Sequence, residues 1–122
     1  MTEGPVLVVV VDDSVEIREL LRVVLGLDER VELVGEACNG REGVELVAQL
    51  QPDVVLLDME MPVLSGMEAL PELGLRAPRS KVVMFSSGRE DLEARALAEG
   101  ACAFRTKGSD LDELVDLVVE LG

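Results

Sequence analysis

The sequence contains no histidine and only two cysteines among its 122 residues. Without histidine, the chain cannot form the Ser-His or Cys-His pairs that activate nucleophiles in many hydrolases. The same shortage excludes a structural zinc site, which draws its ligands mainly from cysteine and histidine. Cys38 and Cys102 fall at the ends of expected strands. We expect both thiols to be reduced and to act as small packing residues.

Basic residues and long apolar runs are also scarce. The 11 Lys and Arg against 25 Asp and Glu leave a net charge of −14, which argues against direct binding to nucleic acid, because phosphates require a basic surface. The longest apolar run, Val6–Val11, is far shorter than the ~20 residues of a membrane-spanning helix. The first residues lack the features of a signal peptide. We therefore expect a cytoplasmic protein without membrane contact.

What the sequence does contain is a regular alternation of apolar strands and amphipathic helices. Hydrophobic residues make up 48% of the chain, which is enough for a core, and the length predicts a single domain over residues 1–122. The expected strands are Val6–Val11, 31–36, Val54–Leu57, 82–85 and 101–105. Continuous apolar runs favour strands that are buried on both faces. We predict an α/β, flavodoxin-like, doubly wound (βα)5 sandwich with a parallel five-stranded sheet in the order 2-1-3-4-5.

Polar residues mark the expected starts of the helices, in three cases with a glutamate three positions later. The expected caps are Asp13, Asn39, Ser65 and Ser109. Pro71 lies inside the expected third helix. Because proline removes a backbone hydrogen bond and crowds the preceding turn, we expect that helix to be short or kinked.

Further polar residues follow the strands at one end of the sheet. They are Asp12 and Asp13 after the first strand, Asp58 after the third, Ser86 at the fourth and Lys107 beyond the fifth. These side chains should converge, because open α/β sheets form their ligand crevice at the carboxyl ends of the strands. Three converging carboxylates need a cation, and oxygen ligands favour Mg²⁺, for which Mn²⁺ could substitute. A carboxylate beside a metal, a lysine and a hydroxyl describes a phosphoryl acceptor.

This set of residues, in this order, resembles the receiver domain of bacterial two-component response regulators. The segment Asp58-Met59-Glu60-Met61-Pro62, followed by Gly66, is similar to the family's stretch after its acceptor aspartate. Gly100-Ala101 resembles the turn before the family's fifth strand. The resemblance covers essentially the whole chain. It implies a phosphoprotein switch that catalyses its own phosphoryl transfer and dephosphorylation, and not a turnover enzyme.

The resemblance also implies a role for each acidic residue. Asp58 would accept a phosphoryl group from a histidine kinase or a phosphotransfer protein. Asp13 would ligate Mg²⁺ directly, together with Asp58 and the backbone carbonyl of Glu60. Asp12 would act on the ion through a water molecule.

Three further residues receive roles from the same resemblance. Lys107 would pair with the phosphoryl oxygens, and Ser86 would bind one of them in the modified domain. Phe104 matches the family's switch aromatic, whose ring moves inward as the hydroxyl moves toward the phosphate. The family usually has proline after the lysine, whereas this chain has Gly108. A cis bond before glycine would cost ~3 kcal/mol, so we expect a trans bond there.

Modification of Asp58 is then expected to repack one face of the domain, because a single dianionic group can shift a two-state equilibrium. This face comprises the helix around residues 92–98, the strand 101–105 and the last helix. It would control an effector domain or a downstream protein, and a dimer would form through it. Charges of both signs on this face suit a protein partner, namely Arg89, Asp91, Arg95, Glu99 and Arg105.

Other interpretations of the same residues stay open. The chain could be a pseudo-receiver that binds a partner without phosphorylation. It could also be a phosphatase with an aspartyl nucleophile, in which Glu60 would fill the acidic position two residues after Asp58. Asp12 and Asp13 could serve only as helix caps, and Phe104 could be a plain core residue.

Two smaller expectations concern lifetime and output. Glu60 and Ser87 lie close in sequence to Asp58 and Ser86, and we expect them to tune the lifetime of the phosphoryl group. Residues 58–73 most resemble receivers attached to chemotaxis-type methylesterases. Lys107-Gly108-Ser109 instead resembles receivers with helix-turn-helix effectors, so the sequence does not select one output.

Overall fold

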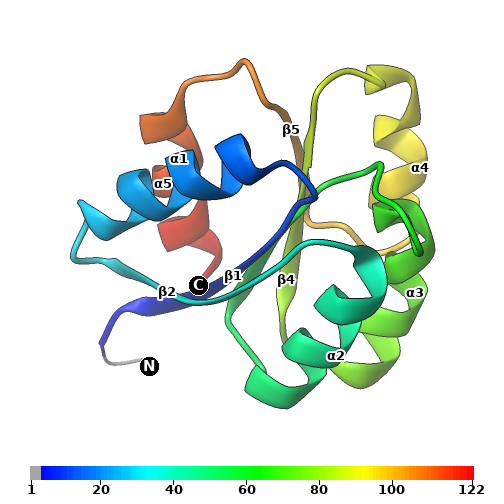
Figure 1. Cartoon of the computed structure of the whole chain (residues 1–122), viewed down its shortest axis with the longest axis horizontal. Coiled ribbons are helices and arrows are strands. Elements are labelled where there is room, and N and C mark those ends of the chain that lie inside the picture. The colour runs from blue at the N-terminus through cyan, green and yellow to red at the C-terminus, as the bar shows by residue number, and fades with distance from the viewer. Residues whose placement is uncertain (1–3) are drawn as a thin grey trace.

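The computed structural model of the chain describes residues 4–122 and shows a parallel sheet between two layers of helices (Figure 1). The strands are β1 (Val6–Val11), β2 (Val31–Ala37), β3 (Val54–Leu57), β4 (Lys81–Ser86) and β5 (Ala103–Thr106). The helices are α1 (Val15–Gly26), α2 (Gly40–Leu50), α3 (Gly66–Arg76), α4 (Glu93–Ala98) and α5 (Leu111–Leu121), with a 3₁₀ turn at Glu90–Leu92. All paired strands are parallel, and their order is β2-β1-β3-β4-β5. The predicted flavodoxin-like fold is confirmed.

The side chains of each central strand alternate between two apolar cores. Val8, Val10 and Leu56 point to the face that α1 and α5 cover, whereas Val9 and Leu57 point to the face covered by α2, α3 and α4. Because both faces are covered, β1, β3 and β4 consist almost entirely of apolar residues instead of alternating with polar ones. Burial therefore leaves the ends of these strands as the main places where polar side chains can gather.

The helix starts differ from the sequence prediction at two places. Ser14, not Asp13, caps α1 and accepts a hydrogen bond from the backbone N–H of Ile17. Asp110, not Ser109, caps α5. The Ser109 hydroxyl instead donates to the carbonyl of Thr106 at 2.6 Å. The other two predicted caps are confirmed.

The predictions for Pro71 and for the cysteines are corrected in part. Helix α3 runs through Pro71 for 11 residues, so it is not short. Proline has no N–H to donate to the Met67 carbonyl four positions before it, and Pro71 faces solvent. Cys38 and Cys102 are free thiols, as expected, but both are exposed and neither packs in the core. Each lies just outside a strand, where the alternation that buries strand residues no longer applies.

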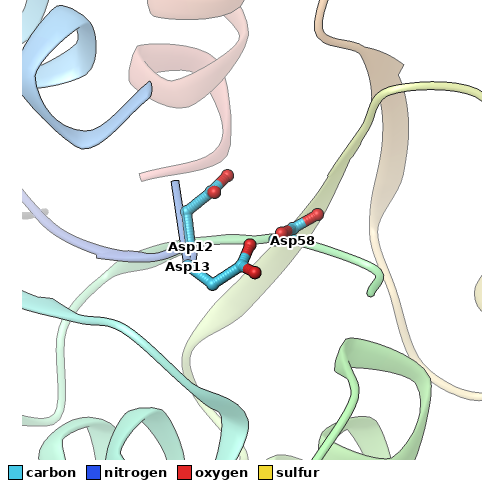
Figure 2. Close-up of side chains that lie close together, drawn as sticks. All are labelled: Asp12, Asp13 and Asp58. Carbon is cyan, nitrogen blue, oxygen red and sulfur yellow. The ribbon is translucent and has the colours of Figure 1, made fainter. Parts of the chain in front are cut away.

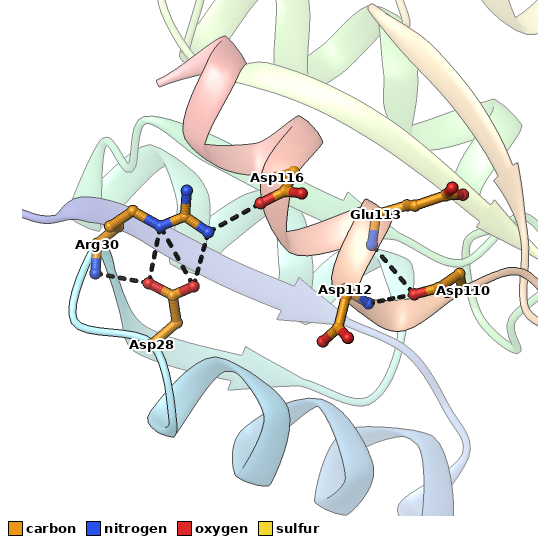
Figure 3. Close-up of polar contacts among 6 residues, drawn as sticks. All are labelled: Asp28, Arg30, Asp110, Asp112, Glu113 and Asp116. Carbon is orange, nitrogen blue, oxygen red and sulfur yellow. Dashed lines mark hydrogen bonds and ion pairs between the residues drawn. The ribbon is translucent and has the colours of Figure 1, made fainter.

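A surface ion pair network joins α5 to the turn before β2 (Figure 3). The Arg30 guanidinium lies 2.8 Å from Asp28 and 2.9 Å from Asp116. Hydrogen bonds from Arg30 lower the pKa of Asp28 to about 2.

Within residues 4–122, no helix has the length and apolar character needed to cross a membrane.

Gly66, the first residue of α3, sets how closely this helix approaches the strand end that carries Asp58. A Cβ atom at residue 66 would overlap the carbonyl group of Asp58. The N–H of Gly66 donates to the Met59 carbonyl at 2.8 Å. Glycine is therefore required for the backbone to pass behind the acidic end of β3.

We predict opposite effects for two glycine substitutions in α3. Gly66→Ala should lower the free energy of unfolding by roughly 2–4 kcal/mol, because backbone atoms must move to admit the methyl group. Gly74→Ala should raise it by about 0.5–1 kcal/mol, because a Cβ atom there meets nothing within 4 Å and alanine favours the helix. Urea unfolding of both variants measures the difference. Equal effects would contradict the assigned backbone contact.

Candidate functional site

The carboxyl ends of β1 and β3 bring Asp12, Asp13 and Asp58 together (Figure 2). The two strands are neighbours, with Val11 paired to Leu57. The N–H of Asp58 donates to the carbonyl of Val11 at 2.8 Å, so the ladder continues into the acidic cluster. Strand pairing itself therefore fixes the separation of residues that lie far apart in the sequence.

The three carboxylates form a compact acidic cluster with oxygen donors only. Each offers a ligand oxygen within 4.8 Å of the others. Asp12 and Asp58 are buried, with exposed fractions of 2% and 5%, whereas Asp13 is exposed. Like charges at this separation repel, and a hard divalent cation relieves that repulsion. The donor set fits Mg²⁺ or Mn²⁺, with Asp13 on the side open to solvent.

Lys107 supplies a positive charge in the same place. Its Nζ lies 2.8 Å from Asp12 Oδ2 and 3.2 Å from Asp58 Oδ1. Burial alone lowers the pKa of Lys107, but the hydrogen bonds and charges of Asp12 and Asp58 outweigh this and raise it. The Lys107 N–H donates to the Ser86 carbonyl at 2.7 Å. The bond to Gly108 is trans, as predicted, and the lysine nevertheless reaches the cluster.

Asp58 has an unusual electrostatic environment for an aspartate. Burial and repulsion by Asp12 raise its pKa to about 6, although the Lys107 amine acts in the opposite direction. A carboxylate of raised basicity is a better nucleophile than one at the ordinary value, provided that it is ionised at the working pH. At neutral pH Asp58 meets that condition.

Ser86 and Phe104 lie on β4 and β5 beside this cluster. The hydroxyl of Ser86 is buried and donates to the carbonyl of Gly88. The ring of Phe104 is 5% exposed and packs in the core beneath α2, α3 and α4, paired across the sheet with Met84. Phe104 therefore holds an inward position and does not line the cleft.

The cluster opens into a cleft of about 630 Å³. Its lining residues include Asp13, Asp58, Glu60, Ser86 and Lys107, all predicted from the sequence. Ser87, which was also singled out from the sequence, lines the cleft as well. The Glu60 side chain is exposed.

Two arginines near the cluster received no role at the site from the sequence. Arg18 Nη1 donates to the backbone carbonyl of Asp12 at 2.7 Å. Arg89 was assigned only to the partner face, yet it lines the cleft and pairs with Glu60 at 3.0 Å. No sequence spacing could reveal the pairing of Arg89 with Glu60, since it depends on how two loops are placed.

Comparison with known proteins places this arrangement in a family. Residues 8–119 match the model of the response regulator receiver domain. The chain is 48% identical over 109 residues to a protein-glutamate methylesterase/protein-glutamine glutaminase of Symbiobacterium thermophilum, and the match covers 88% of this chain and 30% of that protein. It is 32% identical over 114 residues to the nitrate/nitrite response regulator protein NarL of Escherichia coli K12, covering 93% and 53%. The chain thus spans only a third to a half of these relatives.

Solved structures agree in fold. The signal receiver domain of the putative response regulator NarL from Mycobacterium tuberculosis superimposes with a TM-score of 0.90 at 33% identity, covering 97% of this chain and 96% of that one. The response regulator domain of Thermotoga maritima CheB gives 0.88 at 33% identity, covering 96% of each. The resemblance stated from the sequence is therefore confirmed.

We predict that Asp58→Asn stabilises the metal-free domain at neutral pH. The folded-state pKa of about 6 exceeds the ordinary 3.8. Ionisation therefore costs folding free energy, and stability present at low pH is lost as pH rises through 6. Relative to wild type, the Asn variant should gain stability between pH 4 and 7, up to about 3 kcal/mol.

Thermal or urea unfolding in EDTA measures this gain, and adding Mg²⁺ should shrink it by stabilising the wild type. Asp116→Asn, on the exposed face of α5, is the matched control and should show no such rise. An Asp58→Asn variant that is less stable than wild type at pH 7 would contradict the assigned repulsion.

Proposed function

The chain belongs to the response regulator receiver domain family, and we propose that it works by Mg²⁺-dependent acceptance of a phosphoryl group on Asp58. The observation that carries this proposal is the position of the Lys107 amine, 3.2 Å from Asp58 Oδ1 beside three converging carboxylates. Such a site holds a nucleophile and the means to neutralise the charge of an incoming phosphoryl group.

The chain's own residues account for the transfer step. An Asp58 oxygen attacks phosphorus in line with the bond to the donor, which for a histidine kinase or a phosphotransfer protein is a P–N bond. The electron pair of that bond leaves with the donor. Lys107 turns from Asp12 and Asp58 toward a phosphoryl oxygen, and the Ser86 hydroxyl binds another.

Asp13, Asp58 and the backbone carbonyl of Glu60 would hold the Mg²⁺ ion, with Asp12 acting through water. When bound, the ion neutralises charge on the phosphoryl oxygens. Asp13 is the exposed member of the cluster, which suits a ligand that must capture an ion from solvent.

Ser86 and Phe104 would connect the site to α4, β5 and α5. The Ser86 hydroxyl is engaged by Gly88 in the unmodified domain, and a dianionic phosphoryl group is a stronger acceptor. Helix α4 should resist movement least among the helices, because it has six residues and only Ala96 of these is buried. Repacking there would control an effector domain or a downstream protein, and a dimer would form through the same face.

We predict that the purified chain gains the mass of one phosphoryl group when incubated with acetyl phosphate and Mg²⁺. Asp58→Asn should abolish this gain because the nucleophile is removed. EDTA should suppress it because it removes the Mg²⁺ ion that relieves the repulsion among the three carboxylates. Asp116→Asn should behave as wild type. Intact-protein mass spectrometry measures all four samples.

Two results would favour the other interpretations. A wild-type mass that stays constant with acetyl phosphate and Mg²⁺ would indicate a pseudo-receiver that binds its partner without modification. Continuous release of phosphate from a phosphoester substrate, far beyond one equivalent, would indicate a phosphatase with Asp58 as nucleophile.

A further inference from the structure

The turn between β5 and α5 carries Lys107 and is closed by Ser109. The Ser109 hydroxyl donates to the Thr106 carbonyl at 2.6 Å, and the Ser109 backbone N–H donates to the same oxygen at 3.1 Å. Both bonds span residues 106–109, so Lys107 and Gly108 are the two central residues of the turn. Within residues 4–122, no other side chain hydrogen-bonds to the backbone of this turn. Ser109 therefore stiffens the segment that carries the lysine.

The Ser109 hydroxyl is available for this contact because its neighbour Asp110 caps α5. The Asp110 side chain accepts two hydrogen bonds from backbone N–H groups in the first turn of that helix. On the other side of the turn, the Lys107 N–H donates to the Ser86 carbonyl and extends the ladder between β4 and β5. The turn is thus held between the end of the sheet and the start of α5, with Ser109 closing the segment between them.

The direction of the Lys107 side chain depends on the backbone of this turn. Its amine ends a flexible four-carbon stem and contacts the two buried carboxylates of Asp12 and Asp58 at 2.8 and 3.2 Å. A change in the backbone dihedrals at Lys107 would swing the amine away from both. Gly108 does not supply the restraint, since glycine limits the backbone least of all residues. A neighbouring contact must therefore supply it.

We propose that Ser109 is a positioning residue for the phosphoryl acceptor site, because its hydroxyl fixes the turn that aims the Lys107 amine at Asp12 and Asp58. This inference rests on the proposed phosphoryl acceptance and adds a residue to it. Ser109 acts only through Lys107: its hydroxyl is bonded to the Thr106 carbonyl, and it does not line the cleft.

Loss of this hydroxyl should move two measurable quantities in opposite directions. The Lys107 amine and a divalent cation are both positive, so they compete for the oxygens of Asp12 and Asp58. A loosened lysine therefore lets Mg²⁺ bind more tightly. Phosphoryl transfer slows at the same time, because the phosphoryl oxygens lose a well-placed positive partner. A serine that merely stabilised the fold would, on removal, weaken Mg²⁺ binding and slow transfer together.

The test compares wild type with Ser109→Ala on the intact chain. Isothermal titration calorimetry measures Mg²⁺ binding, and intact-protein mass spectrometry follows the gain of the phosphoryl group from acetyl phosphate. Ser109→Ala should bind Mg²⁺ more tightly and gain the phosphoryl group more slowly, each by about two- to tenfold, the range that one hydrogen bond covers. Ser109→Thr keeps the hydroxyl and should restore wild-type values.

Two further variants show whether the effect passes through the lysine. Gly108→Ala is the matched control in the same turn, because a Cβ atom there meets nothing within 4 Å and its φ is not left-handed. It should leave Mg²⁺ affinity and transfer rate unchanged. Lys107→Gln removes the amine through which Ser109 acts. In that background, Ser109→Ala should cause no further change in Mg²⁺ affinity, since effects that share one path are not additive.

The outcomes separate this inference from the function on which it rests. Unchanged or weaker Mg²⁺ binding in Ser109→Ala, or a shift that persists without the lysine amine, would overturn the positioning role while phosphoryl acceptance stands. A wild type that binds Mg²⁺ but never gains a phosphoryl group would overturn the proposed function, whereas tighter Mg²⁺ binding by Ser109→Ala would still support the hold on Lys107. A wild type that binds no Mg²⁺ would overturn both.

Discussion

Repulsion among the carboxylates of Asp12, Asp13 and Asp58 is the constraint on which the site depends. The ladder between β1 and β3 holds Asp12 and Asp58 side by side. Burial strengthens their repulsion because little water screens it. Lys107 offsets part of this cost through its two short contacts, at 2.8 and 3.2 Å. The rest of the cost makes the cluster receptive to any further positive charge.

This uncompensated repulsion affects both the stability of the folded domain and its tendency to bind a cation. A fold that holds acidic groups together without full compensation is less stable than it could be, and a cation that binds only the folded state recovers that stability. Burial, followed by repulsion from Asp12, raises the pKa of Asp58 to about 6, which expresses the same imbalance. The backbone tolerates the arrangement because Gly66 lets α3 approach the Asp58 carbonyl, while two apolar cores hold the strands from both faces.

The loops after β3 and β4 place a second cation, Arg89, at the rim above the acidic cluster. Lys107 acts at the floor of the cleft, where burial makes its ion pairs strong, and Arg89 acts at the rim, where solvent makes its ion pairs weak and reversible. The two cations thus differ in how strongly solvent screens their ion pairs.

The fold and most of the site residues could be predicted because they rest on local patterns: apolar runs set the strands, and Asp58, Ser86 and Lys107 follow them directly. Finer details could not be predicted in this way. Neighbouring polar residues compete for each capping position. Ser14 therefore caps α1 in place of Asp13, and Asp110 caps α5 in place of Ser109. Exposure of Cys38 and Cys102 depends on where each strand ends.

The order of the β-α units and the chemistry at their ends were determined by the sequence alone, because periodicity and residue type act over short distances. The tertiary structure decided which charges meet. Lys107 reaches both Asp12 and Asp58 despite Gly108, and Arg89 meets Glu60 across the cleft, because strand order and loop conformation bring together groups that are distant in the chain. Electrostatic energy depends on distance in space, which no sequence spacing records.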